Sequence, residues 1–261
     1  MKDYPIKLGT VLFTMVQPHA GHEVEYNRWY ERDHFYSGCM IGAYTFAGQR
    51  WVATRGLKEL RYPQRPSPIT PDPAIGSYLG LYWVLAGHHD EWNRWSVDQV
   101  TWLHANGRMF AARDHIHTLL YNYEWGALAD PDGPSVELAL DHRYPGLAVT
   151  VAEASDARPD LEAWYREQLS PAALAASGVG QVVALTPRPL LDDAPGDVPR
   201  APSGEQTLML LWFLNRPADE AWAATFAGHS AQVEDSGHGR LVWASPFLPT
   251  VPGTDRYTDE L

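Results

Sequence analysis

The sequence predicts an α+β protein made of two tandem units, each with the element order strand, helix, strand, strand, helix, strand. Apolar runs typical of strands alternate with amphipathic helical stretches in the same order in both halves of the chain. A Trp-Tyr pair occurs in a predicted helix at Trp29 and Tyr30 and again at Trp164 and Tyr165, an offset of 164 − 29 = 135 residues. The repeated order and the repeated pair together favour a tandem duplication.

The first unit is expected to span residues 1–127. Its strands are short runs rich in β-branched and aromatic residues, and its helices have apolar residues at helical spacing. We expect strands at 8–16, 41–54, 78–86 and 114–125, and helices at 22–36 and 90–108. Prolines crowd residues 55–76, which predicts a long loop in the middle of this unit.

Residues 128–145 contain Pro131, Gly133 and Pro134 and have the composition of a linker. The second unit is then expected at 146–261, with its own Pro-rich loop at 187–204. Its strands are expected at 147–154, 180–186, 207–214 and 239–247, and its helices at 159–176 and 218–233. A further match in letters places Trp83 over Trp212, an offset of 212 − 83 = 129 residues.

Each such unit is a ferredoxin-like sheet with helices on one face, so its other apolar face must be covered. We expect the two antiparallel sheets to pack against each other as an intramolecular α/β barrel, which hides both apolar faces. A ligand cavity is then expected between the helices and the outer sheet face of one unit.

The formal charge of −12 argues against nucleic acid as a partner, because a negative surface repels phosphate. Cys39 is the only cysteine, which excludes an internal disulfide and a Cys-based metal cluster. We see neither a signal-peptide pattern nor an apolar run of the ~18 residues that a membrane helix needs. We therefore expect a cytoplasmic protein without a membrane partner, either a monomer or a homodimer.

The stretch EYNRWYERDH at 25–34 contains the candidate catalytic residues. Asn27, Tyr30 and His34 are three and four residues apart, so an α-helix would place them on one face. A histidine has a reference pKa near ~6.5 and can give or accept a proton at neutral pH. The corresponding stretch of the second unit has Leu169 where the first has His34. The first unit is therefore expected to be the active half.

Tyr26, Asn27, Trp29, Tyr30 and His34 resemble the FNxWYxxxHxP signature of EthD-like domains in the dimeric α/β-barrel superfamily. Here Tyr replaces the Phe, and the final Pro is absent. The resemblance covers residues 8–125. It implies small-molecule chemistry without an organic cofactor, namely dehydration, cyclisation, isomerisation, lyase steps or cofactor-free oxidation of aromatic polyketides.

His115 and His117 lie two apart in a predicted strand, so both are expected on one face, approaching His34. Three histidines could bind a divalent metal, but polar residues at the start of a strand are the simpler interpretation, and we assign no metal and no cofactor. The expected substrate-binding residues are Tyr44, Trp51, Trp83, Trp95, His115, His117 and Tyr121.

The leading hypothesis is a cofactor-independent enzyme that acts on a hydrophobic aromatic or polyketide-like molecule by histidine acid/base chemistry, of the dehydratase, cyclase or isomerase type. A cofactor-free monooxygenase of the same superfamily and a non-catalytic small-molecule binding protein remain alternatives, with haem binding a minor one. The sequence contains no Ser-x-Gly elbow, Gly-rich phosphate loop or His-Glu-x-x-His string.

Overall fold

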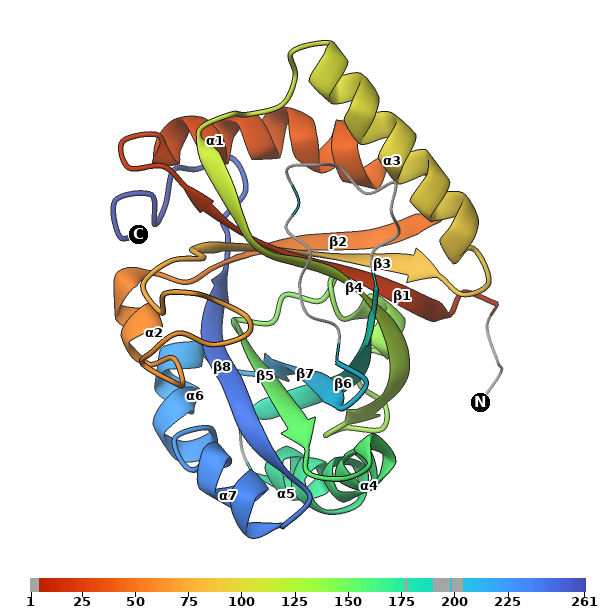
Figure 1. Cartoon of the computed structure of the whole chain (residues 1–261), viewed down its shortest axis with the longest axis vertical. Coiled ribbons are helices and arrows are strands. Elements are labelled where there is room, and N and C mark those ends of the chain that lie inside the picture. The colour runs from red at the N-terminus through yellow and green to blue at the C-terminus, as the bar shows by residue number, and fades with distance from the viewer. Residues whose placement is uncertain (1–4, 177, 190–197, 199–203) are drawn as a thin grey trace.

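Eight strands form a closed antiparallel barrel in the order β1-β3-β2-β8-β5-β7-β6-β4 (Figure 1). The structure is a computed structural model that describes residues 5–176, 178–189, 198 and 204–261. The strands of the first half are β1 (Leu8–Pro18), β2 (Thr45–Val52), β3 (Tyr78–Leu85) and β4 (Arg113–Leu128). Those of the second half are β5 (Gly146–Ala154), β6 (Val179–Arg188), β7 (Thr207–Leu214) and β8 (Gly239–Pro249).

The strand order repeats. It is β4-β1-β3-β2 in the first half and β8-β5-β7-β6 in the second. In each half, therefore, the fourth strand in sequence lies beside the first, then come the third and the second. The two seams between the halves are unequal. β4 and β6 pair over a long register from Leu120 opposite Arg188 to Leu128 opposite Gln181. β2 and β8 pair only through Trp51 with Pro249 and Val52 with Leu248. Strands of both halves thus share one sheet, and the boundaries at 127 and 146 stay a prediction.

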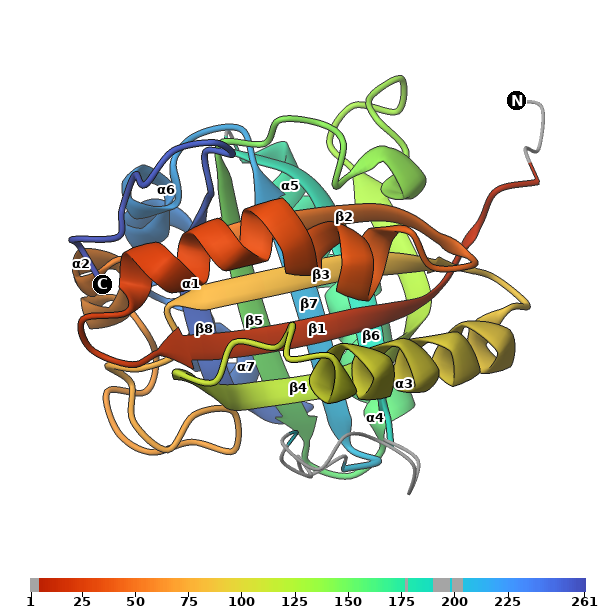
Figure 2. The same ribbon diagram turned by 90° about the horizontal axis from the view of Figure 1, so that it is seen from above.

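The long helices lie outside the barrel, on two opposite sides (Figure 1). On the first half, α1 (Glu23–Trp29) continues into the π-helix η1 (Tyr30–Met40), which lies beside α3 (His89–Ala105) (Figure 2). The second half carries α4 (Arg158–Trp164), η3 (Tyr165–Leu169), α5 (Ser170–Ala175), α6 (Ala218–Thr225) and α7 (His229–Asp235). Two short helices, α2 (Arg55–Glu59) and η2 (Val136–Leu138), complete the set in the described part of the chain. None of the helices in the described ranges is long and apolar enough to span a membrane.

Large apolar side chains fill the barrel. They alternate along the strands with residues that point out towards the helices, as a pleated strand requires. Full burial of one such side chain contributes roughly 1.5–3 kcal/mol to stability. Among those with under 2% exposure are Phe13, Trp51, Trp83, Phe213 and Trp243. The barrel is therefore a packed core, and space for a ligand is found outside it.

The predicted strands and helices are all present, but three segments differ. The first helix continues to Met40 instead of ending near residue 36, because its hydrogen bonds change to π register. The helix expected at 218–233 is broken between Thr225 and His229. The Pro-rich loop at 55–76 contains α2 and is held against β8 by Arg61, whose Nε donates to Ser245 Oγ at 2.9 Å. The expected loop at 187–204 lies mostly outside the described residues.

The match in letters between Trp83 and Trp212 is not a structural match. Trp83 points into the barrel, whereas Trp212 points outwards and packs beneath the helices of the second half. Tyr82, which pairs with Leu12 on β1, occupies the outward position in the first half. An offset that is wrong by one residue exchanges the two faces of a strand.

Candidate active site

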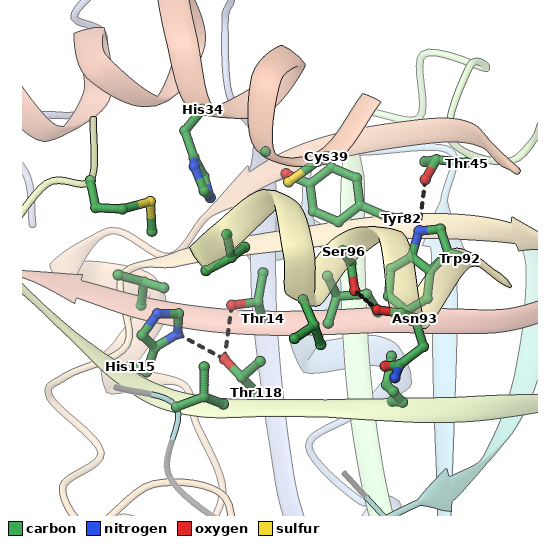
Figure 3. A pocket seen from close by; sticks show the side chains of 18 of the residues that line it. Thr14, His34, Cys39, Thr45, Tyr82, Trp92, Asn93, Ser96, His115 and Thr118 are labelled. Carbon is green, nitrogen blue, oxygen red and sulfur yellow. Dashed lines mark hydrogen bonds between the residues drawn. The ribbon is translucent and has the colours of Figure 1, made fainter. Parts of the chain in front are cut away.

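A cavity of about 120 Å³ lies where the expectation placed it, between the helices and the outer sheet face of the first half (Figure 3). Its size is comparable to the ~150 Å³ cavity that takes up benzene in another protein. It therefore suits a group the size of one ring. Its walls come mostly from apolar side chains of β1, α3 and β4, including Leu12, Val16, Trp92, Trp95, Val100 and Leu120.

His34 points from η1 into this cavity (Figure 3). Its imidazole stacks on the indole of Trp29, with ring centroids 4.6 Å apart and planes 18° from parallel. Tyr30 meets it edge-on at 5.2 Å. Residues five apart lie about 140° apart around an α-helix, but a π-helix bonds residue i to i+5 and brings them together. The π register therefore explains why Trp29 supports His34.

Gly38 leaves the room that the imidazole needs. A Cβ at this position would lie 2.5 Å from His34 Cε1, closer than side chains approach one another. The backbone of Gly38 has no unusual conformation that demands glycine. Space for the His34 ring is thus the physical reason for a glycine here.

His115 lies on the opposite wall, in a row of hydrogen bonds across β4 and β1 (Figure 3). Arg113 Nη2 lies 3.3 Å from His115 Nε2. Since a guanidinium can only donate, Nε2 accepts, and the proton of neutral His115 is on Nδ1. Nδ1 then donates to Thr118 Oγ1 at 2.9 Å, and Thr118 Oγ1 lies 2.9 Å from Thr14 Oγ1. These contacts determine the tautomer of His115.

His117 does not join this site, and the expectation that it shares a face with His115 is wrong. β4 has a bulge here. Val16 of β1 pairs with His115, and its neighbour Met15 pairs with His117, so the residue of β4 between the two histidines has no partner on β1. His117 therefore points into the barrel, where its Nε2 lies 2.9 Å from Tyr121 OH. Burial lowers its pKa to about 4. Within the described residues, no group of three His, Cys, Asp or Glu side chains is arranged to hold a metal ion.

Of the predicted catalytic and substrate-binding residues, Tyr30, His34, Trp95 and His115 line the cavity. Three other predicted residues, Trp51, Trp83 and Tyr121, point inwards from their strands. They lie in the barrel core together with His117.

Two further predicted residues do not line the cavity. Tyr44 has a positive φ of 71° and stacks on His88 at 4.0 Å, immediately before the start of β2. Asn27 donates to the Thr254 carbonyl at 2.9 Å and accepts from Arg50 at 3.0 Å. The change to π register after Trp29 alters the rotation per residue, so Asn27 and His34 do not share the face that α-helical spacing predicts.

Sequence reasoning missed Tyr82 and Cys39, which line the cavity beside Tyr30. The hydroxyls of Tyr30 and Tyr82 are 2.6 Å apart. Burial raises the pKa of the Cys39 thiol to about 12 and holds the pKa values of both tyrosines well above their usual range. All three groups are therefore neutral at physiological pH. Strand alternation could have found Tyr82, because it must face away from its inward neighbour Trp83.

In the equivalent region of the second half, described side chains pack against one another. His229 of α7 lies 3.0 Å from Tyr165 OH, and its ring is edge-on to Trp212 at 5.7 Å. Burial lowers the pKa of His229 to about 4, so it stays neutral. Leu169, at the position of His34, packs against the same apolar cluster. This half therefore has aromatic packing where the first has its cavity.

No family model and no curated protein matches the sequence. Similar solved structures include a proposed chlorite dismutase (8% identity, 98% of this chain and 100% of that chain, TM-score 0.54). They also include an anthrone oxidase-like protein (10% identity, 95% of each chain, TM-score 0.52). A third is a proposed monooxygenase from Fusobacterium nucleatum subsp. nucleatum (9% identity, 94% and 93% of the two chains, TM-score 0.50).

At these identities the likeness concerns the fold alone. The shared feature is the closed eight-stranded antiparallel barrel, which this chain builds from both of its halves. The resemblance to EthD-like domains of the dimeric α/β-barrel superfamily stays a hypothesis based on the residues around His34.

Proposed function

We propose that the protein is a cofactor-independent enzyme that acts on a hydrophobic aromatic or polyketide-like small molecule, with His34 as its general acid and base. The position of the imidazole supports this proposal most directly. It projects into an apolar cavity, is held in place by Trp29, and faces a wall that contains His115 and Thr118. Such a placement allows proton transfer to a bound molecule that is shielded from water.

The chemistry that suits these groups is proton removal from a carbon beside an aryl ketone. His34 would take the proton, and the electron pair would move onto the ketone oxygen. The bond between Tyr30 and Tyr82 uses one of their two hydroxyl protons. The ketone oxygen would take the other in place of the Cys39 sulfur, a weak acceptor that lies within hydrogen-bond reach of both hydroxyls. If a β-hydroxyl is present, the protonated His34 returns the proton to it, and water leaves as the C–C double bond forms. This sequence is a dehydration.

The cavity does not fit a haem, whose macrocycle is several times larger than a space of about 120 Å³. The described residues also lack a metal-binding group of three ligands. We therefore derive no step through either group.

A second candidate is a cofactor-free monooxygenase, favoured by the likeness in fold to an anthrone oxidase-like protein. It begins with the same proton removal, from the methylene of an anthrone, of whose three fused rings the cavity of about 120 Å³ would hold one. Dioxygen would then oxidise the carbanion, so that anthrone and O₂ give anthraquinone and water. Consumption of dioxygen without added metal or flavin separates this candidate from the dehydration.

The test uses 3-hydroxy-1-phenylpropan-1-one, which has one ring, and anthrone as two probes. We expect turnover of at least one probe, with at least a hundredfold loss of kcat in His34→Ala and an unchanged circular dichroism spectrum. His22→Ala, just before the same helix and paired with Glu25 at the surface, is the matched control. Equal kcat in the folded His34→Ala protein and the wild type would exclude His34 as the acid and base.

A further inference from the structure

A second and larger hollow, of about 640 Å³, lies along one edge of β2. It is bounded by η1, by residues 140–145, which follow η2, and by residues 249–252, which follow the seam with β8. Small-molecule sites usually measure ~300–1,000 Å³. The hollow is therefore large enough to hold a ligand, and it is separate from the cavity that contains His34.

The short seam between β2 and β8 leaves this edge open. Pairing stops at Trp51 and Pro249, and the next contact is the Thr250 N–H, which donates to the Arg50 carbonyl at 3.1 Å. Peptide groups alternate in direction along a strand, so those of Gly48 point to the same side as those of Arg50. They face the hollow, because the tail after Pro249 no longer runs beside β2 as a strand. A ligand can therefore meet both a backbone donor and a backbone acceptor.

Two buried polar side-chain atoms at this edge have no hydrogen-bond partner among the described residues. They are Arg50 Nη2 and Gln49 Oε1. Arg50 is only 5% exposed, and its guanidinium carbon lies 4.4 Å from the centre of the Tyr30 ring. A buried donor or acceptor without a partner destabilises a protein. Because Nη2 is covered, an oxygen acceptor reaches it only after neighbouring side chains shift, and that contact would remove the cost.

The charges around the hollow indicate what kind of molecule fits. Two cationic and two anionic side chains line it, 2 − 2 = 0, so it attracts neither sign of ion strongly. Half of the remaining lining residues are aromatic or proline. The charged residues are Arg50, Arg143, Glu31 and Asp141, and the aromatic ones are Phe35, Tyr36 and Tyr144.

We propose that this hollow is a second ligand site for an uncharged, largely apolar molecule with a carbonyl oxygen, which accepts a hydrogen bond from Arg50. The π-helix η1 forms a wall of both spaces, with Tyr30 and His34 on one side and Glu31 and Phe35 on the other. The Tyr30 ring lines the first cavity, and the Arg50 guanidinium packs over the same ring. Tyr30 is therefore a residue at which the two spaces adjoin. Binding at this site does not depend on the reaction proposed above.

The experiment is an NMR titration of the ¹⁵N-labelled full chain with 1-tetralone, a bicyclic ketone. Its reporters are the Gly48 amide and the Arg50 Nε–H. We expect saturable shifts at both reporters, and a dissociation constant at least tenfold weaker for tetralin, which lacks the oxygen. Val251→Trp fills the hollow and abolishes the shifts, and Tyr36→Ala removes an exposed wall residue and weakens binding. Ser96→Trp, which fills the first cavity instead, leaves them intact.

Any of four results would overturn the proposal. They are an absence of saturable shifts at the two reporters, equal affinity for tetralin, tighter binding of the anionic 1-naphthoate, or unchanged shifts in a folded Val251→Trp protein. None of these readouts uses turnover. A protein without activity on any probe can therefore still bind at this site, and the two proposals are tested separately.

Discussion

The imidazole of His34 lies almost parallel to the indole of Trp29, 4.6 Å away, five residues along a helix that changes from α to π register between them. This contact orients the histidine that η1 projects into the first cavity. Trp29 is anchored in turn, since its Nε1 donates to the Arg108 carbonyl at 2.8 Å. The position of the candidate acid and base therefore depends on a local departure from α-helical geometry.

Replacement of Trp29 by Leu should lower kcat about tenfold, because the imidazole loses the surface that orients it. The half-buried indole also contributes packing, so the free energy of unfolding should fall by about 2 kcal/mol in urea titrations. Trp164→Leu in the second half is the matched control and should leave kcat unchanged. If Trp29→Leu retains wild-type kcat, the stack has no role in turnover.

Gly38→Ala should displace the His34 ring, because the new methyl group would lie 2.5 Å from Cε1. We expect kcat to fall ten- to a hundredfold, measured with whichever probe the enzyme turns over. A Cβ added at Gly56 in α2 would have nothing within 4 Å of it. Gly56→Ala should therefore keep full activity and raise the melting temperature slightly, since alanine stabilises a helix by roughly 0.5–1 kcal/mol relative to glycine.

His115 and His117 should behave in opposite ways when each is changed to Gln. His115→Gln alters the cavity wall and should lower kcat with little effect on the melting temperature. His117→Gln replaces a side chain that is 2% exposed in the barrel core. It should lower stability by about 2–3 kcal/mol, as expected when a buried hydrogen bond and its packing are lost. A large loss of stability in His115→Gln would contradict the bulge that separates the two residues.

Stability should fall between about pH 6.5 and pH 4. Burial lowers the pKa of His117 and of His229 from 6.5 to about 4. Below pH 6.5 the unfolded chain binds protons that the folded protein does not, so unfolding becomes more favourable. Each histidine contributes stability that is complete above pH 6.5 and lost as the pH falls through 4, roughly 3 kcal/mol at most.

Urea unfolding at a series of pH values measures this loss. His229→Phe should be less steeply dependent on pH than the wild type, because one of the two buried imidazoles is gone. His22→Asn removes an exposed histidine instead and should leave the slope unchanged. Equal slopes for the wild type and His229→Phe would show that His229 does not titrate as its burial implies.

The order of strands and helices could be predicted from local patterns, because each element is identified by its own spacing of apolar residues. The same holds for the helix that carries Tyr30 and His34. These features depend on residues close together in the chain, which contact one another whatever the rest of the molecule does.

The direction in which particular side chains point could not be predicted from local patterns. A bulge opposite Val16 turned His117 into the core, the π register separated Asn27 from His34, and a seam of two residue pairs left β2 open beside Arg50. In each case the partner strand or the packed neighbour sets the geometry. The sequence by itself therefore determined which elements form and in what order, whereas only the tertiary structure decided which way they face, because strand register and helix phase result from contacts between residues far apart in the chain.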